Sequence, residues 1–288
     1  MQLLDPLTSR RRHVLKCIYF SLISSLISRP PTSFAVSQDN NKLLLEIRLE
    51  QNLMTLPPYA MESTDVFYPS YFYGTWDVTS TLSSVEAPCG EVLFGGDTRL
   101  QKAIGDIGST LTYRSRFIQS GDSRIIADRE FNVQEIAKAS MGDASVLDIH
   151  ASSNLVSCTL YPKGSDQILH ADLVILARRQ ENTNETTFTC SEVSQQIIST
   201  VEENEAKIRG GFTTPNYKNR QLKQIETIST FTSQNTTTEQ IHCIQRTATF
   251  LVPSQQDPIA LQLWQATQGR PIDVRFYTVL YSKNNNNT

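Results

Sequence analysis

The chain has 288 residues, of which 39% are hydrophobic and 19% are charged. This is enough to bury the core of one large domain or two small ones, and the composition excludes collagen-like, coiled-coil and wholly disordered chains. Five of the 26 basic and one of the 29 acidic residues lie within residues 1–35, so the remainder has 21 basic and 28 acidic residues and a formal charge of −7. An acidic body without a basic stripe argues against nucleic-acid binding and against electrostatic attachment to an anionic membrane.

Residues 1–35 have the organisation of a cleavable export signal. Arg10–Arg12 form a basic start, and the apolar run Cys17–Ile27 is too short and too serine-rich for a good membrane span. Small residues at the −3 and −1 positions predict cleavage after Ala35. Residues 11–16 also resemble a twin-arginine signal, which is read by a translocase that passes folded proteins. An ordinary export signal and a retained anchor remain alternatives, and both thylakoid-lumen import and bacterial export use such segments.

The cysteines give no metal signal. Cys17 lies in the predicted signal, and Cys89, Cys158, Cys190 and Cys243 are widely spaced without a C-x-x-C motif. A metal site is therefore not expected. Two alternatives remain, namely buried free thiols or one disulfide, which an oxidising export compartment would permit.

The chain then divides into a linker and a β-rich body. Residues 36–65 are predicted to be a linker with one short helical run near Leu43–Gln51. Residues 86–108, with Pro88 and five glycines, are predicted to be a long loop. Alternating and β-branched runs predict strands at Tyr73–Ser83, Thr110–Ile118, Arg124–Phe131, Ser145–Ala151, Leu155–Tyr161, Gln167–Arg179, Leu222–Thr232, Gln240–Val252 and Arg270–Ser282.

Helices are expected to interrupt the strands. Asn132–Met141 begins with a capping residue and ends before a glycine. Ser191–Glu203 places three apolar residues at i, i+4 and i+8, the stripe of an amphipathic helix. Asp257–Thr267 is a connecting segment with helical character, and the Asn-rich residues 284–288 are predicted to be a disordered tail.

These elements predict a mostly β fold over residues 66–283. About nine sequential antiparallel strands leave two open edges unless the first and last strands pair, and closure into an up-and-down barrel removes both edges. We therefore expect a calycin-like β-barrel with two or three short helices.

A short motif at the start of the first strand supports closure. Gly74-Thr75-Trp76 resembles the G-x-W motif of calycin barrels, in which the tryptophan packs under an arginine of the closing strand. Arg275 lies in the last predicted strand and is the expected partner, so Gly74, Trp76 and Arg275 are predicted to close the barrel. The alternative is a core tryptophan and a surface arginine that never meet.

Several short blocks occur in the order found in one family. The chain resembles a cyanobacterial and plastid family defined by a domain of unknown function, DUF6816, over roughly residues 66–283. The blocks that carry the resemblance are Tyr68–Leu82, Ala87-Pro88, Asp128–Asn132, Ser191-Glu192 with Gln195-Gln196, Gln221–Thr227, Gln255–Pro258 and Gly269–Tyr277. The four cysteines of the body and the loops around Asn182–Thr187 and Asn235–Thr238 depart from it. The resemblance implies a photosynthetic lineage and, with the export signal, the thylakoid lumen, but no activity.

Catalytic signals are weak. His150, His170 and His242 have no metal-ligand spacing, and no hydrolase or P-loop motif occurs. No catalytic residue, metal or cofactor is therefore predicted, and an enzyme is the less favoured class. If Arg129 and Arg275 both point inward, they could hold an acidic ligand group; the alternative is that Arg129 is an internal ion-pair partner. A cavity with Arg129 or Arg178 inside would favour an acidic, tetrapyrrole-like ligand.

The sequence thus predicts an exported binding protein. Its expected partner is a small amphipathic ligand, held by Arg129, Arg178 and Tyr277, or a thylakoid protein. The alternatives are an assembly or stability factor that uses residues 86–108 as its contact, and a bilin-lyase-like enzyme. The predicted location is the thylakoid lumen, with the bacterial periplasm as the alternative.

Overall fold

The computed structural model describes most of the predicted body. The described residues are 43–161, 167–182, 184–201, 207–209, 212–214, 217–234, 239–253 and 258–283. The predicted signal segment, residues 36–42 and the predicted tail lie outside them. No helix among the described residues has the length and apolar character needed to span a bilayer.

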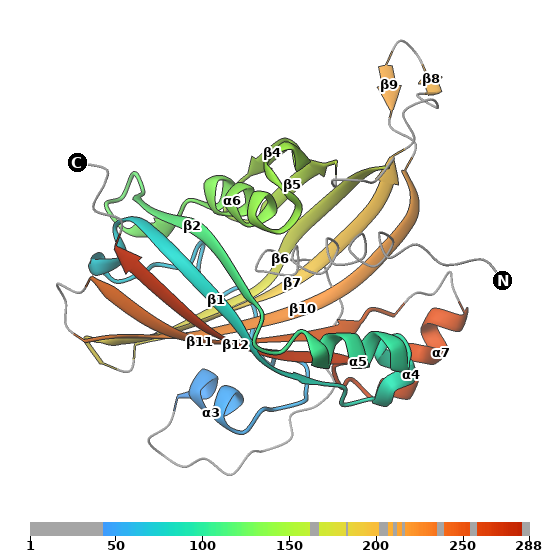
Figure 1. Cartoon of the computed structure of the whole chain (residues 1–288), viewed down its shortest axis with the longest axis horizontal. Helices are drawn as coiled ribbons and strands as arrows, with labels where there is room; N and C mark the ends of the chain where they lie inside the picture. The colour runs from blue at the N-terminus through green and yellow to red at the C-terminus, as the bar shows by residue number, and fades with distance from the viewer. Residues whose placement is uncertain are drawn as a thin grey trace.

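One antiparallel sheet of ten strands dominates the fold (Figure 1), in the order β3-β2-β1-β12-β11-β10-β7-β6-β5-β4. The strands are β1 (Gly74–Glu86), β2 (Thr110–Gln119), β3 (Ile125–Ala127), β4 (Val146–Ala151), β5 (Leu155–Leu160), β6 (Ile168–Asn182), β7 (Thr187–Val201), β10 (Tyr217–Ser233), β11 (Gln240–Leu251) and β12 (Asp273–Lys283). A small separate hairpin joins β8 (Lys207–Arg209) to β9 (Phe212–Thr214). The predicted mostly β, antiparallel, barrel-like fold is confirmed.

The helices lie outside the sheet. They are α3 (Leu44–Glu50), α4 (Gly90–Phe94), α5 (Asp97–Gly105), α6 (Arg129–Met141) and α7 (Pro258–Thr267), with short 3-10 turns η1 (Ser70–Phe72) and η2 (Asp143–Ser145). Figure 1 shows α6 over the opening between β2 and the β4–β5 hairpin, α3 on the opposite side of the sheet, and α4, α5 and α7 together at one end. We call the face toward α6 concave and the face toward α3 convex.

The sheet is a half-barrel that a helix completes. β1 and β12 pair as expected, so the break lies between β3 and β4. β3 pairs only with the last residues of β2, Phe117–Gln119. Next to them, the backbone N–H of Arg116 donates to Oδ1 of Asn132 (2.6 Å), whose Nδ2 donates to the carbonyl of Arg116 (3.1 Å). Because this amide replaces the hydrogen bonds of a neighbouring strand, α6 covers the free edge of β2.

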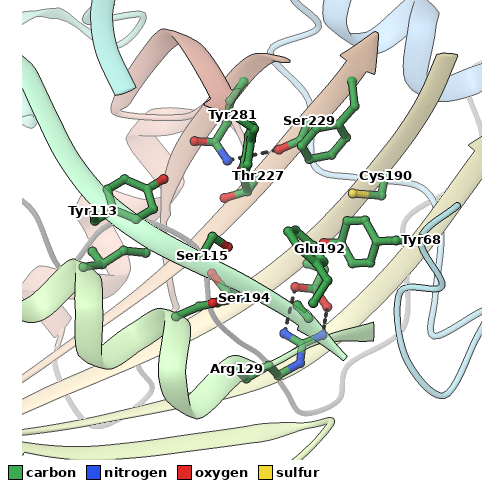
Figure 2. A pocket seen from close by; sticks show the side chains of 16 residues that line it. Tyr68, Tyr113, Ser115, Arg129, Cys190, Glu192, Ser194, Thr227, Ser229 and Tyr281 are labelled. Atoms are coloured by element: carbon green, nitrogen blue, oxygen red, sulfur yellow. Dashed lines mark hydrogen bonds and ion pairs between the residues drawn. The ribbon is translucent and has the colours of Figure 1, made fainter. Parts of the chain in front are cut away.

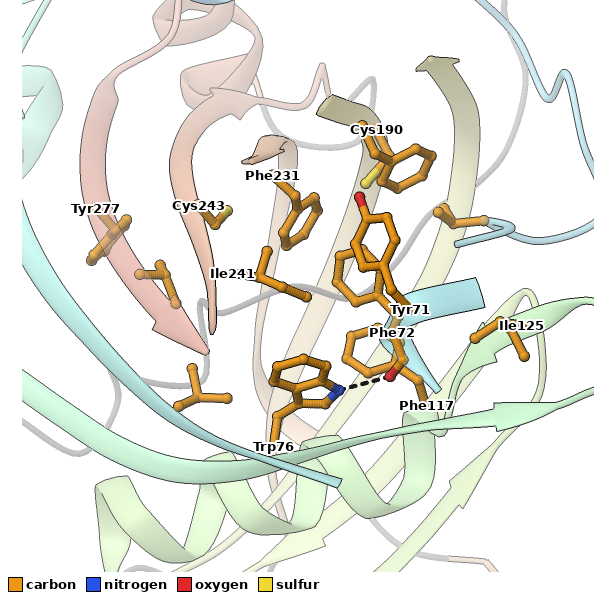
Figure 3. Packing of buried hydrophobic residues seen from close by; sticks show 14 of the residues in the cluster. Tyr71, Phe72, Trp76, Phe117, Ile125, Cys190, Phe231, Ile241, Cys243 and Tyr277 are labelled. Carbon is orange, nitrogen blue, oxygen red and sulfur yellow. Dashed lines mark hydrogen bonds between the residues drawn. The ribbon is translucent and has the colours of Figure 1, made fainter. Parts of the chain in front are cut away.

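An aromatic cluster fills one end of the concave side (Figure 3). Figure 3 shows Phe72 between Phe117 and Phe231, with ring centroids 4.9 and 5.2 Å away. Tyr68 packs against the same rings, 4.7 Å from Phe117 and 5.0 Å from Phe72 between centroids. The buried indole of Trp76 donates to the carbonyl of Phe72 at 2.7 Å. The block Tyr68–Trp76 therefore joins the entry to β1 to the core.

Residues 43–65, predicted to be part of a linker, are integral to the fold. The expected helical run is α3, and its Leu45 is fully buried against Val193 and Ile228 on the convex face. Met61 forms a bridge to Arg178 on β6, and Tyr68 forms one to Ile125 on β3. The chain before β1 thus covers the outer face and then crosses from β6 to the edge strand β3.

Three local predictions are wrong. Ser191–Glu203 is not a helix, because residues 191–201 belong to strand β7. Residues 86–108 contain the helices α4 and α5 rather than only a loop. Strand β3 ends at Ala127, and α6 begins at Arg129 because the carboxylate of Asp128 caps it by accepting from the N–H of Phe131 (3.2 Å).

Candidate functional site

A small chamber with hydroxyl groups in its wall lies in the concave interior (Figure 2). Its volume is about 90 Å³, and strands β2, β7, β10, β11 and β12 and helix α6 contribute side chains to its walls. Alternation along β7 turns Cys190, Glu192 and Ser194 inward. The other hydroxyl groups of the wall come from Tyr68, Tyr113, Ser115, Thr227, Ser229 and Tyr281. The chamber therefore combines these hydroxyl groups with apolar wall, which supplies the larger part of its exposed lining.

A four-residue ionic network forms the base of the chamber. Arg129 donates through Nη1 and Nη2 to the carboxylate of Glu192 (3.1 and 2.8 Å) and through Nη2 to Oδ1 of Asp65 (2.6 Å). Nε of Arg178 donates to the same Glu192 at 2.8 Å, and its Nη2 donates to the carbonyl of Ser153 at 2.7 Å. Two arginines thus face two carboxylates, and their formal charges cancel.

The surroundings set the protonation of the site. Burial alone would raise the pKa of Glu192, but Arg129 and Arg178 together hold it below its ordinary value. Burial raises the pKa of the phenols of Tyr68, Tyr113 and Tyr281, and that of the Cys190 thiol. At neutral pH the chamber therefore presents protonated phenols and a protonated thiol, and Cys190 is not an activated nucleophile.

A larger cleft adjoins the chamber on the outside. Its volume is about 480 Å³, and it lies between the first turn of α6, strands β2 and β3, Asp65 and the turn that follows β4. Arg129 and Ala127 line both the chamber and the cleft. Apolar side chains at Ile118, Ile126 and Phe131 supply part of the cleft wall. The two hollows therefore adjoin at Arg129.

A second ionic cluster is buried on the convex face, where α3 meets the sheet. Glu226 accepts from Nε and Nη2 of Arg48 (both 2.9 Å), from Nη1 of Arg246 (3.1 Å) and from the hydroxyl of Tyr59 (2.9 Å). The side chains of Glu226 and Arg246 are fully buried. The donors come from α3, from the segment before β1 and from β11, so the cluster ties the segment before β1 to the sheet.

The predicted pair of Trp76 and Arg275 does not form. In the register of β1 and β12, Trp76 lies opposite Lys283, whereas Arg275 lies opposite Val85 and pairs with Asp273 (2.8 Å). Nζ of Lys283 lies 4.9 Å from the indole centroid of Trp76 and donates to the carbonyl of Tyr73 at 2.8 Å. The last strand thus places a cation over the tryptophan, but the cation is a lysine.

Gly74 precedes this contact and has a backbone reason to be glycine. Its φ of +114° is a conformation that residues with a side chain rarely adopt. A Cβ there would also meet Cε of Lys283 at 3.7 Å, which is ordinary contact. Backbone conformation, rather than lack of space, therefore favours glycine.

Of the predicted ligand residues, the structure brings Arg129 and Arg178 together on Glu192. Tyr277 is buried in the aromatic cluster and lines neither hollow. The prediction missed Glu192 and Asp65. Glu192 could have been found, since a β6–β7 hairpin places it opposite Arg178, but the helix predicted from Ser191 hid this pairing.

The histidines form no catalytic arrangement. Oδ1 of Asp172 accepts from the hydroxyl of Ser157 (2.8 Å) and also contacts Nε2 of His170 (3.1 Å). In a hydrolase triad the histidine uses one ring nitrogen for the nucleophile and the other for the acid. Here Ser157 and Asp172 both contact the same nitrogen, Nε2 of His170, at 3.5 and 3.1 Å. His150 and His242 are exposed. Among the described residues, no group of three or more His, Cys, Asp or Glu could hold a metal ion.

All four cysteines of the body are free thiols, and Cys158, Cys190 and Cys243 are buried whereas Cys89 is half-buried. Of the two alternatives, the structure therefore supports free thiols.

The fold and the site define a class of protein: an antiparallel half-barrel completed by one helix, with a small chamber whose wall carries hydroxyl groups beside a network of two arginines and two carboxylates. The family model for a domain of unknown function, DUF6816, matches residues 60–282. Since this is more than half of the chain, the chain belongs to the DUF6816 family. No curated protein matches the sequence.

Proposed function

We propose that this chain is a non-catalytic binding protein that holds a small amphipathic molecule in its half-barrel. The observation that carries the proposal is the chamber of about 90 Å³ in the interior, whose wall combines apolar surface with hydroxyl groups. Protein interiors are close-packed, and buried polar groups normally have partners. A hollow with both kinds of wall therefore favours a small amphipathic molecule.

The size of the chamber limits what enters it. An engineered cavity of about 150 Å³ binds one benzene, and sites for drug-sized ligands have volumes of roughly 300–1,000 Å³. The chamber therefore accommodates only a small molecule or one end of a larger one. A tetrapyrrole does not fit the chamber, so the bilin-lyase-like alternative gains no support from it.

The proposed setting is a photosynthetic organism, and the proposed fold relationship is to the calycin barrels. The supporting observations are the resemblance blocks, the cation over the G-x-W tryptophan, and the export signal, which lies outside the described residues. We propose the thylakoid lumen as the location, with the bacterial periplasm as the alternative. N-terminal sequencing of the native protein is expected to begin at Val36, and an intact Met1 in a membrane fraction would contradict this location.

The binding proposal is tested by purification from the source without denaturants. Organic extraction of the purified protein, followed by mass spectrometry, is expected to release one small amphipathic molecule in near-stoichiometric amount. The proposal would be contradicted if the native protein released no small molecule and had the mass of the chain alone.

An assembly or stability factor is the second candidate, and one observation favours it. Val92 on α4 and Ile259 on α7 are 78% and 69% exposed, and Ile104, Ile107 and Leu263 are also exposed. A hydrogen bond from Nη1 of Arg270 to the carbonyl of Pro88 (3.4 Å) links the two regions. This end suits a protein partner.

The second candidate has its own test. The double variant Val92→Asp/Ile259→Asp would lose a co-purifying protein, while Thr112→Asp, an exposed change on β2, would retain it. Retention of the same partner by both variants would contradict a contact at this end.

A further inference from the structure

The outer edge of β4 is an unpaired strand edge. β4 is last in the sheet order and pairs with β5 alone. At the other end of the sheet, Tyr68 bonds to Ile125 of β3, and the amide of Asn132 covers β2. Among the described residues, no backbone hydrogen bond from outside the β4–β5 hairpin reaches Ile149 or Ala151. An open strand edge is a template for a further strand.

The geometry of the hairpin determines which backbone groups point outward. The N–H of Ser152 donates to the carbonyl of Leu155 at 2.7 Å, so these residues form a hydrogen-bonded pair, and the same register continues along the strand to His150. Hydrogen-bonded pairs alternate along an antiparallel ladder. The N–H and C=O groups of His150 therefore face β5, whereas those of Ile149 and Ala151 face away from it. These outward groups are available to a neighbouring strand.

The two faces of β4 have different surroundings. Ile149 points to the concave side, where it belongs to the same buried cluster as Ala137 and Met141 of α6. Alternation turns Asp148 and His150 to the convex side, where their side chains are 58% and 77% exposed. Nε2 of His150 lies 3.2 Å from Oδ2 of Asp148. The helix thus packs on one face of the strand, and the exposed ionisable groups lie on the other.

The order Asp148-Ile149-His150 is complementary to itself. In an antiparallel pair with a two-fold axis at Ile149, the carboxylate of Asp148 lies opposite the imidazole of His150 in the second copy, and the reverse pair forms as well. An imidazole has an N–H donor in either protonation state, and a carboxylate accepts. The outward groups of Ile149 in the two copies then exchange a pair of hydrogen bonds. A register shifted by two residues would place His150 against itself and lose these contacts.

We propose that two copies of this chain pair antiparallel along β4 and join their sheets into one. The occupant of the edge is a second copy because the complementary groups, an acid and an imidazole, both come from this strand. The pairing also covers both open edges in one closed, symmetric contact.

Exchanging the two side chains tests this pairing. Sedimentation equilibrium of the full-length chain at neutral pH is expected to show a reversible monomer–dimer equilibrium. His150→Asp places carboxylates opposite each other in both symmetry-related pairs, so the dissociation constant should rise at least about fivefold. The exchanged variant Asp148→His/His150→Asp restores both opposite pairs, and its dissociation constant should return to within about twofold of the original value.

A proline tests the backbone contact. The N–H of Ala151 faces the open edge, so Ala151→Pro removes no hydrogen bond to β5 but hinders the approach of a further strand. Dimerisation should be lost in this variant, whereas Thr112→Asp, at an exposed position of β2, should leave it unchanged. Near-ultraviolet circular dichroism checks that each variant is folded. If Ala151→Pro does not fold, the exchanged variant decides.

Three results would overturn the inference. The first is a chain that stays monomeric at every concentration, whichever other protein it binds. The second is a dimer that folded Ala151→Pro retains, or that the exchanged variant fails to restore after its loss in His150→Asp. The third is a dimer that is lost in Val92→Asp/Ile259→Asp but not in His150→Asp, because that result places the contact at the apolar end of the molecule.

Discussion

Removing the charge of Glu226 is the sharpest test of how the segment before β1 is held. The carboxylate is fully buried and accepts from Arg48, Arg246 and Tyr59, so Glu226→Gln leaves two buried guanidinium groups without their central counter-charge. Breaking a buried ion pair by removing one partner costs about 3–5 kcal/mol. We expect Glu226→Gln to lower the free energy of unfolding by about that amount.

The assay is urea unfolding followed by circular dichroism, with the slope against urea fitted separately for each protein. Glu62→Gln is the matched control, because Glu62 is an exposed partner of Arg179 and its loss should change stability by less than about 1 kcal/mol. If Glu226→Gln costs no more than Glu62→Gln, the cluster does not anchor this segment, and the argument that residues 43–65 belong to the folded body is refuted.

Three further results are expected. Trp76→Ala should lower the free energy of unfolding by about 3–5 kcal/mol. In double-mutant cycles, Trp76→Ala should couple to Lys283→Met by roughly 0.5–3 kcal/mol, whereas the effects of Trp76→Ala and Arg275→Ala should add within about 0.5 kcal/mol. Coupling to Arg275 instead would contradict the register of β1 and β12. Alkylation of the native protein should modify Cys89 before the buried thiols, and a bridged pair that needs reduction would contradict the four free thiols. Burial raises the pKa of Cys158 to about 12. The contribution of the protonated thiol to stability is therefore complete below about pH 8.5 and is lost as the pH rises toward the pKa of the folded state. The urea midpoint should fall less steeply above about pH 9 in Cys158→Ala than in the original chain.

The sequence predicts the strands better than their partners. Alternation located most of the β-strands, because each strand buries one face. The helix predicted from Ser191 failed for a definable reason: Val193, Ile197 and Val201 are spaced by four, and a spacing of four places residues on one face of a strand as well as on one side of a helix. The apolar spacing therefore fits a strand as well as a helix, and the intervening residues, rich in Ser, Thr and Gln, do not distinguish the two.

Long-range register accounts for the other misses. Whether Arg275 or Lys283 lies opposite Trp76 depends on how β1 and β12 align, and nearly the whole fold separates the two strands in sequence. The burial of Leu45 was likewise hidden, because nothing local indicates that the convex face needs a cover. An internal ion pair of Arg129 was one of the alternatives that the sequence left open, but its carboxylate partners, Asp65 and Glu192, come from distant elements.

The central claim is that the chamber holds a ligand, and filling the chamber tests it most directly. Ser115 is a buried residue of β2 whose side chain lines the chamber, and Thr112 on the same strand is exposed. Native mass spectrometry of the protein produced in its source organism compares Ser115→Leu with Thr112→Leu. The account predicts that Thr112→Leu retains the small molecule of the original chain and that folded Ser115→Leu loses it. Equal occupancy in the two variants would contradict the claim.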